Sequence, residues 1–111
     1  GAVLFRRRPD DGLLGGLIEL PSTPWRAAAP DDPEAEAPAA TRWRRIPGRV
    51  RHVFTHLTLE LDLRVGRIDD ARVIDVEEPI WCPPGSFHSL ALPTLTRKLL
   101  AHVDRAGERR T

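Results

Sequence analysis

The 111-residue sequence contains one cysteine and no long apolar stretch. The single thiol, Cys82, excludes an internal disulfide, a cysteine-rich zinc site and a self-contained iron–sulfur cluster. The longest apolar runs are only a few residues, whereas a membrane-spanning helix needs about 20. Residues 1–5 lead directly into three arginines, a charge order that does not fit a signal peptide. We therefore expect a protein of the reducing cytoplasm that has no membrane partner.

The sequence also lacks the motifs of common catalytic and metal sites. It has no HExxH or CxxC pattern for zinc, no GxSxG nucleophile motif and no P-loop. His52 and His56 would be about 13 Å apart on an extended chain, which is too far to share one zinc ion. We interpret His88 and His102 as structural or surface residues, and Cys82 as a buried, neutral thiol.

Two pairs of adjacent carboxylates, Asp69-Asp70 and Glu77-Glu78, lie beside predicted turns. Neither pair has apolar neighbours that would bury it and perturb its pKa, so both are interpreted as solvated charges. The sequence therefore offers no general acid or base, and no metal site is expected.

The formal net charge is only +1, but the charged residues are unevenly distributed. Sixteen of the 17 basic residues are arginines, and five arginines fall within residues 42–51. Arginine suits phosphates and base edges better than lysine does, because its guanidinium group forms paired hydrogen bonds. The bias also has a simpler explanation, since a GC-rich genome favours arginine codons.

Alternation of apolar and polar residues predicts a chain rich in β-structure. The clearest pattern covers residues 57–65, where leucines alternate with polar residues as in a half-buried strand with one wet face. A turn is expected at Pro47-Gly48. Weaker patterns predict further strands at residues 2–5, 17–20, 41–46, 50–54 and 72–76.

A helix is expected near the C-terminal end, with Pro93 in its first turn and Gly107 as its cap. Its apolar stripe has spacings of three, four and four residues and consists of Leu92, Leu95, Leu99 and Val103. Strands followed by a helix predict an α+β domain, in which the helix packs on a mixed or antiparallel sheet. The length suits a single domain over residues 1–111.

Residues 22–41 form a low-complexity segment, and five of the 11 prolines lie within residues 21–41. The proline spacing forbids a long helix there, and apart from Trp25 no residue is expected to anchor to a core. We expect residues 22–41 to contain a mobile loop, and residues 105–111 to form a disordered tail.

The segment 49–56 remains as the candidate site, because it combines basic, aromatic and hydroxyl side chains between two predicted strands. Arginines can hold phosphates, while a hydroxyl and an imidazole can read a base edge. The simpler alternative is a hairpin that buries Phe54 in the core and leaves Arg49 and Arg51 in solvent. The candidate residues are Arg49, Arg51, His52, Phe54, Thr55 and His56.

Three sequence blocks resemble the C-terminal domain of MutY-type adenine DNA glycosylases. They are GLLGGLIELP at residues 12–21, HVFTH at residues 52–56, and Leu92-Pro93-Thr94 with Arg97-Lys98-Leu99-Leu100. Their order and rough spacing agree with the family, and the resemblance runs from about residue 2 to residue 104. The resemblance implies a Nudix-like fold that recognises 8-oxoguanine mispaired with adenine, in support of base excision repair.

The same resemblance places the catalytic carboxylates, the helix-hairpin-helix motif and the [4Fe-4S] cluster in an N-terminal domain outside this sequence. The chain alone is therefore expected to be catalytically inactive and to carry no cofactor. Its expected partners are that N-terminal domain and double-stranded DNA containing an 8-oxoguanine·adenine pair. It is expected to be a monomer that works at the bacterial nucleoid.

In the MutY-type glycosylases that this sequence resembles, the recognition loop is typically Phe-Ser-His, which aligns with Phe54, Thr55 and His56. This sequence departs from that pattern at the middle position, where threonine keeps the hydroxyl. The resemblance thus assigns base reading to Thr55, with His56 supporting the base or reaching a phosphate.

Two alternative functions stay open. One is Nudix hydrolysis of nucleotides. Nudix hydrolases resemble one another in a glutamate-rich helix that holds magnesium. Here the acidic residues of segment 31–36 are interrupted by Pro33, which disfavours that helix. The other is a protein-docking module that uses residues 22–41 as a flexible tether.

Overall fold

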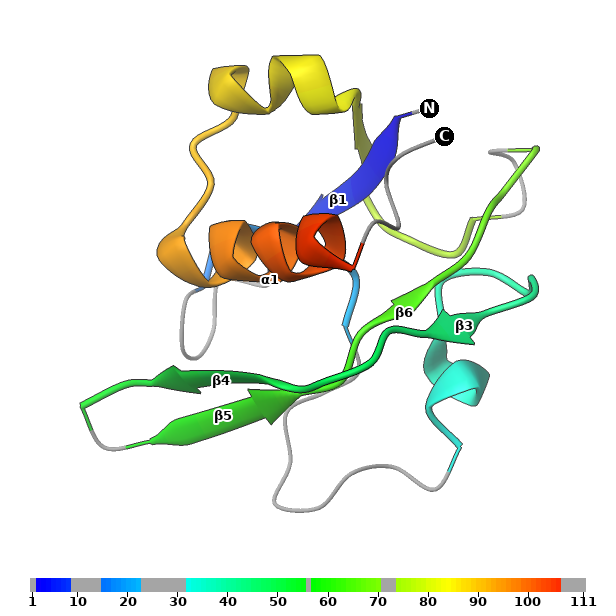
Figure 1. Ribbon diagram of the computed structural model, residues 1–111. Coiled ribbons are helices and arrows are strands. Elements are labelled where there is room, and N and C mark those ends of the chain that lie inside the picture. Colours follow the sequence, from blue (N-terminus) through cyan, green and yellow to red (C-terminus); the bar gives the residue numbers. More distant parts are fainter. Residues whose placement is uncertain (1, 9–14, 23–31, 56, 71–73, 107–111) are drawn as a thin grey trace. The chain divides into compact units, whose positions relative to one another are not determined.

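The structure is a computed structural model that describes residues 2–8, 15–22, 32–55, 57–70 and 74–106 (Figure 1). The chain divides into two compact units, each formed from two separate stretches of sequence. Unit 1 comprises Gly1–Ala40 and Ile68–Pro93, and unit 2 comprises Thr41–Arg67 and Thr94–Thr111. In chain order the elements are β1 (Val3–Arg7), β2 (Ile18–Glu19), η1 (Pro33–Glu36), β3 (Arg44–Arg45), β4 (Val50–Val53), β5 (Thr58–Leu61), β6 (Arg64–Val65), β7 (Ile80–Cys82), η3 (Pro84–Ser89) and α1 (Thr94–Arg105), where η denotes a 3-10 helix.

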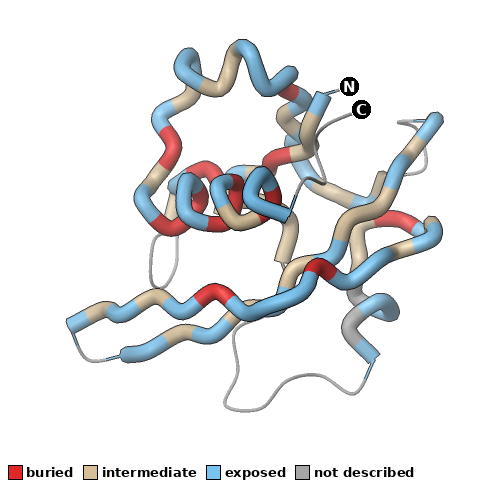
Figure 2. Tube along the Cα trace, in the orientation of Figure 1, coloured by how far each residue is buried: buried red, intermediate tan, exposed pale blue. Residues whose placement is uncertain are grey.

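Unit 1 is built on a three-stranded antiparallel sheet in the order β2-β1-β7. β1 is the middle strand, because its first half pairs with β7, as at Val3↔Cys82, and its second half pairs with β2. Phe5 of β1 is fully buried, and its ring meets that of Phe87 edge-on at 5.4 Å. The buried hydrophobic residues of unit 1 are Phe5, Ile18, Ala39, Cys82 and Leu92. Figure 2 colours the buried positions red.

The strand predictions for unit 1 are confirmed in part. The predicted strand at residues 2–5 overlaps the first part of β1, and that at residues 17–20 contains β2. The Arg8 N–H donates to the Leu17 carbonyl at 2.8 Å beside the pairing strands. The prediction of a strand at 72–76 is wrong for residues 74–76, which have no regular structure, while 72–73 lie outside the described residues. The Asp75 N–H instead donates to the carbonyl of Pro38 at 2.6 Å, so it is unavailable to a sheet.

The sequence pattern did not predict β7 or most of the order in residues 32–40. β7 has only three residues and follows Pro79 directly, so its alternation is too short to detect. Pro33–Glu36 forms a short 3-10 helix, and Ala39 is buried with 8% exposure. The expectation that only Trp25 could anchor this segment is therefore wrong, because a small alanine also fits a covered position. Residues 23–31 and 107–111 of the predicted loop and tail lie outside the described residues.

Unit 2 contains two short antiparallel pairs, β4-β5 and β3-β6 (Figure 1). The single strand predicted for residues 57–65 is therefore two strands with different partners. Between the paired positions Arg45↔Arg64 and Val50↔Leu61, four residues lie on one side and two on the other. The extra residues bend the chain at Pro47-Gly48, where Gly48 has a φ of 87°. The predicted turn is thus a bend that interrupts the pairing.

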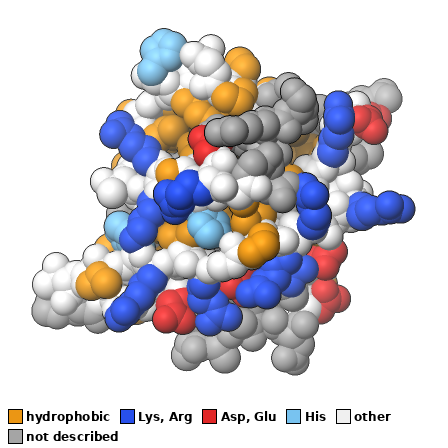
Figure 3. Space-filling model, in the orientation of Figure 1, with side chains coloured by type: hydrophobic (Ala, Val, Ile, Leu, Met, Phe, Trp, Pro, Cys, Tyr) orange, Lys and Arg blue, Asp and Glu red, His pale blue; other side chains and the backbone are white. Residues whose placement is uncertain are grey.

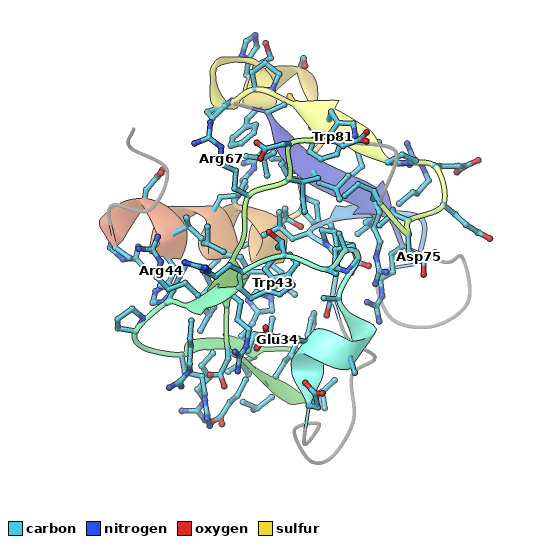
Figure 4. The ribbon with its side chains drawn as sticks, turned by 90° about the vertical axis from the view of Figure 1, so that its right-hand side faces the viewer. Glu34, Trp43, Arg44, Arg67, Asp75 and Trp81 are labelled. Atoms are coloured by element: carbon cyan, nitrogen blue, oxygen red, sulfur yellow. The ribbon has the colours of Figure 1, made fainter. Side chains whose placement is uncertain are left out.

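Gly66 ends β6 at a point of close approach. A Cβ atom added at Gly66 would lie 2.6 Å from Thr41 Cγ2 and 2.7 Å from Trp43 Cε3 (Figure 4). Trp43 precedes β3, so its indole covers the backbone at the end of the partner strand. Only glycine leaves room for that packing, which explains why the alternating pattern stops here.

The C-terminal helix is confirmed as α1, and its apolar face is buried as the spacing predicts. The buried residues of α1 are Leu95, Thr96, Leu99, Leu100 and Val103. Leu92 is buried but precedes the helix, Pro93 comes one residue before its start, and Gly107 lies outside the described residues. α1 packs against β4, where the Lys98 ammonium donates to the Arg51 carbonyl. Antiparallel strands and a C-terminal helix confirm the predicted α+β class.

Candidate functional site

The candidate residues lie on or beside the β4–β5 hairpin of unit 2. The register Val53↔Thr58 continues into a hydrogen bond from the Phe54 N–H to the Leu57 carbonyl at 2.6 Å. Thr55 therefore lies at the tip of the hairpin, and it is exposed. His56 lies outside the described residues, so its predicted role stays a prediction.

Alternation along β4 separates the candidate residues onto two faces. Val50, His52 and Phe54 share one face, which we call the inner face, and Val50 is buried there. The rings of His52 and Phe54 meet edge-on with centroids 4.8 Å apart, and both side chains are half-buried. The two rings brace each other directly behind Thr55, which limits the freedom of the hairpin tip.

Arg49, Arg51 and Val53 share the opposite, outer face, across from β5 residues that include Glu60. The Arg49 Nε donates to Asp62 Oδ1 at 3.0 Å, and its Nη1 donates to Glu60 Oε2 at 3.4 Å. The Arg45 Nη2 donates to the same Asp62 oxygen at 3.4 Å. One acceptor thus serves two guanidinium groups, and all of these side chains are at least a third exposed.

The pKa values of this group move in the directions that ion pairing dictates. Hydrogen bonding to Asp62 is the main cause that raises the pKa of the Arg49 guanidinium. Burial raises the pKa of the Asp62 carboxyl, but the hydrogen bonds and charges of Arg49 and Arg45 outweigh burial and hold that pKa below its usual value. Arg49 and Asp62 therefore carry opposite charges at neutral pH.

Arg51 differs from Arg49 although both lie on the outer face. Among the described residues, the Arg51 guanidinium has no ion-pair partner, and only its backbone carbonyl is engaged, by Lys98. Next to the tip, Val53 is 65% exposed and Leu57 is 46% exposed. The end of the hairpin therefore presents a hydroxyl and two accessible apolar side chains, and the exposed cation Arg51 lies farther down β4, opposite Glu60 in the register.

Sequence reasoning missed several residues that shape this hairpin. Glu60 and Asp62 were expected only as members of a wet face, and the contact of Lys98 with β4 was not predicted. The His102 Nε2 lies 3.1 Å from the Pro47 carbonyl, next to the bend at Gly48, so the interpretation of His102 as structural agrees with its position. Contacts between residues 47 to 55 positions apart leave no pattern in a sequence.

The other chemical candidates lie outside the hairpin. Cys82 is buried as expected, whereas His88 and the described carboxylate pairs are exposed. Within the described residues, no three His, Cys, Asp or Glu side chains gather in a way that could hold a metal ion. In the same part of the chain, no helix is long and apolar enough to cross a membrane.

Charge divides between the two units far more sharply than the net charge indicates. Unit 2 has twelve Arg and Lys against four Asp and Glu, which gives a formal net charge of +8. Unit 1 has five against twelve, which gives −7. Several Lys and Arg side chains are exposed on the face that Figure 3 presents. The hairpin therefore belongs to a strongly basic unit.

Comparison with known proteins decides the family. The family model described as NUDIX domain matches residues 1–102, which is most of the chain. The chain belongs to the NUDIX domain family. This NUDIX domain is also similar to human adenine DNA glycosylase, with 27% identity over 107 residues. The matched region covers 87% of the chain but 20% of the human protein, so the chain spans about a fifth of that relative. The resemblance identified from the three sequence blocks is thereby confirmed.

Proposed function

We propose that this NUDIX domain recognises 8-oxoguanine paired with adenine in double-stranded DNA, as one part of a longer adenine DNA glycosylase. The observation that carries the proposal is the position of Thr55, exposed at the tip of a braced hairpin in the basic unit. The similarity to human adenine DNA glycosylase supports the link to that enzyme class.

The chemistry of the hairpin tip matches the altered base. Guanine presents N7 only as an acceptor, whereas 8-oxoguanine carries hydrogen on N7 and a carbonyl oxygen at C8. The Thr55 hydroxyl can accept from N7–H and donate to the C8 oxygen, because a hydroxyl has both capacities. A matched pair of such contacts discriminates by about 1–3 kcal/mol. The threonine methyl restricts χ1, which fixes the direction of the hydroxyl.

The surrounding residues supply the remaining contacts in this proposal. Arg51, which is exposed, contacts a phosphate and fixes the position of the hairpin on the duplex. Val53 and Leu57 flank the tip and pack against the sugars and bases beside the lesion. Arg49, His52, Phe54 and His56 complete the proposed binding residues, with His52 and Phe54 acting as the brace.

Excision of adenine belongs, in this proposal, to an N-terminal domain that carries the catalytic carboxylates and the [4Fe-4S] cluster. This chain has a single, buried cysteine and so cannot ligate such a cluster itself. The N-terminal domain is then the protein partner, and the domain acts as a monomer in the cytoplasm, at the nucleoid.

The proposal is tested by NMR titration of the labelled 111-residue chain with two duplexes of identical sequence. One duplex contains an 8-oxoguanine·adenine pair, and the other contains guanine at the same position. We expect larger amide shifts for residues 49–57 with the oxidised duplex. Equal shifts with both duplexes would reduce the function to sequence-independent phosphate binding.

Family membership favours a second candidate function, which is magnesium-dependent hydrolysis of an oxidised nucleoside triphosphate. The sequence after β2 enters a proline- and alanine-rich segment, and Pro33–Glu36 forms a 3-10 helix of four residues. Such a helix cannot space carboxylates along one face as a longer α-helix does. Phosphate release from 8-oxo-dGTP with magnesium would establish this alternative, and we expect none.

A further inference from the structure

The ion pairs on the outer face place two acidic residues directly in competition with a DNA phosphate. Arg49 offers five donors, and two of them are already directed at Asp62 and Glu60 at 3.0 and 3.4 Å. A phosphate that approaches Arg49 must replace these carboxylates or share the guanidinium with them. Arg45 is held in the same way, through the same oxygen of Asp62.

The exposure of these side chains allows a phosphate to compete with the carboxylates for Arg45 and Arg49. The side chain of Arg49 is 55% exposed, that of Arg45 is 52% exposed, and that of Asp62 is 34% exposed. A phosphate can therefore reach both arginines. Exposed ion pairs are individually weak because water and salt screen them, so the carboxylates can hold the arginines back from DNA without blocking them.

The same face has a contrasting position two residues along the strand. Arg51 lies nearer the tip and, among the described residues, has no carboxylate on its guanidinium. The outer face is thus neutralised around Arg45 and Arg49, whereas Arg51, four residues before Thr55 and opposite Glu60 in the register, has no carboxylate contact within the described residues.

We propose that Asp62 and Glu60 are positioning residues that hold Arg45 and Arg49 away from DNA phosphates and so weaken binding to undamaged duplex. This inference rests on the proposed DNA-binding function and deepens it. With the base of the hairpin neutralised, lasting attachment depends on the contacts at the tip, where Thr55 reads the base. A protein that searches long stretches of undamaged DNA benefits, because it releases wrong sites faster.

The test measures affinity for an undamaged duplex by fluorescence anisotropy between 50 and 200 mM salt. The variants are Asp62→Asn, which removes the carboxylate that Arg45 and Arg49 share, and Glu60→Gln, which removes the second carboxylate from Arg49. We expect Asp62→Asn to raise affinity about three- to tenfold at 50 mM salt and to steepen the salt dependence by about 0.9 per added phosphate contact. Glu60→Gln should give a smaller rise.

A double-mutant cycle separates action through the arginines from a general change of charge. In an Arg45→Gln, Arg49→Gln background, Asp62→Asn should no longer raise the affinity. Glu77→Gln removes one negative charge from an exposed carboxylate outside the hairpin and serves as the matched control, for which we expect no change in salt slope. Circular dichroism checks that each variant is folded, and an expected gain in affinity cannot arise from unfolding.

Three results would overturn the inference: no gain for Asp62→Asn, an equal gain for Glu77→Gln, or a gain that persists without the two arginines. The proposed function fails separately, when the wild-type chain binds 8-oxoguanine·adenine and undamaged duplexes equally. The cycle uses undamaged duplex only. Its outcome therefore does not depend on whether the wild-type chain prefers the 8-oxoguanine·adenine duplex.

Discussion

Thr55 is the residue on which the proposed recognition depends, and it is exposed at the end of a hairpin. Its neighbours in sequence have different tasks, since Phe54 faces inward against His52 while Val53 faces outward. A change at Thr55 is therefore expected to alter what the tip can bind without disturbing the packing behind it.

Thr55→Ala should reduce the preference for 8-oxoguanine over guanine opposite adenine by roughly five- to 150-fold, the equivalent of about 1–3 kcal/mol. The measurement is the ratio of affinities of the two duplexes, or the ratio of excision rates in the full-length enzyme. Thr55→Ser keeps the hydroxyl and is the matched control, so it should retain most of the preference. An unchanged ratio in Thr55→Ala would remove this residue from base reading.

The ion pairs of Asp62 also give a pH dependence with a definite sign. Because the folded-state pKa of Asp62 lies below its unfolded value, its contribution to stability is present at neutral pH and is lost as the pH falls through the lowered value. The difference in Tm between wild type and Asp62→Asn should therefore be largest near pH 7 and shrink below about pH 4. Thermal unfolding followed by circular dichroism at several pH values tests this, and a constant difference would contradict it.

At the scale of elements, α1 is the most deeply buried part of unit 2. Leu95, Leu99 and Val103 are all buried, whereas the leucines of β5 are only half-buried and Leu57 is exposed. The alternating leucines of residues 57–61 are less buried than their regular pattern predicts, because a two-stranded ribbon covers a side chain less well than the side of a helix does.

Leu99→Ala should therefore destabilise the chain by about 2–5 kcal/mol, as truncation of a buried leucine usually does. Leu61→Ala should cost clearly less, because its side chain is already half in water. Urea denaturation of both variants gives the comparison directly. If Leu61→Ala cost as much as Leu99→Ala, the inner face of the hairpin would have to be covered more fully than its exposure indicates.

For the whole molecule, the two units are interleaved along the chain. Each unit consists of two stretches, so neither can be excised as a continuous fragment. Each is also small for an independent core, because folding buries a smaller fraction of the surface in a shorter chain. The prediction of a single domain over residues 1–111 follows the same reasoning.

We expect one cooperative unfolding transition for the 111-residue chain. Scanning calorimetry should give equal calorimetric and van't Hoff enthalpies, which is the criterion for two-state behaviour. Two resolved transitions would show that the units fold independently and would divide the predicted domain.

Much of the fold could be predicted because local patterns report burial. Phe5 in a short apolar run and the leucine spacing of α1 both gave the right element. The strand predicted at 72–76 failed because the Asp75 N–H bonds to Pro38, which is distant in sequence. β7 was missed because three residues after a proline carry too little periodicity. In the candidate site, Arg49 and Arg51 looked equivalent, and only their contacts distinguish them.

The sequence alone determined the α+β class, the helix and the hairpin segment with its tip residues, because these depend on neighbours within a few positions. Only the tertiary structure decided which arginines are paired with carboxylates and which carbonyls Lys98 and His102 contact. It also decided that position 66 must be glycine, because a Cβ atom there would clash with Trp43. These contacts join residues that are far apart in the chain, so no local sequence pattern predicts them.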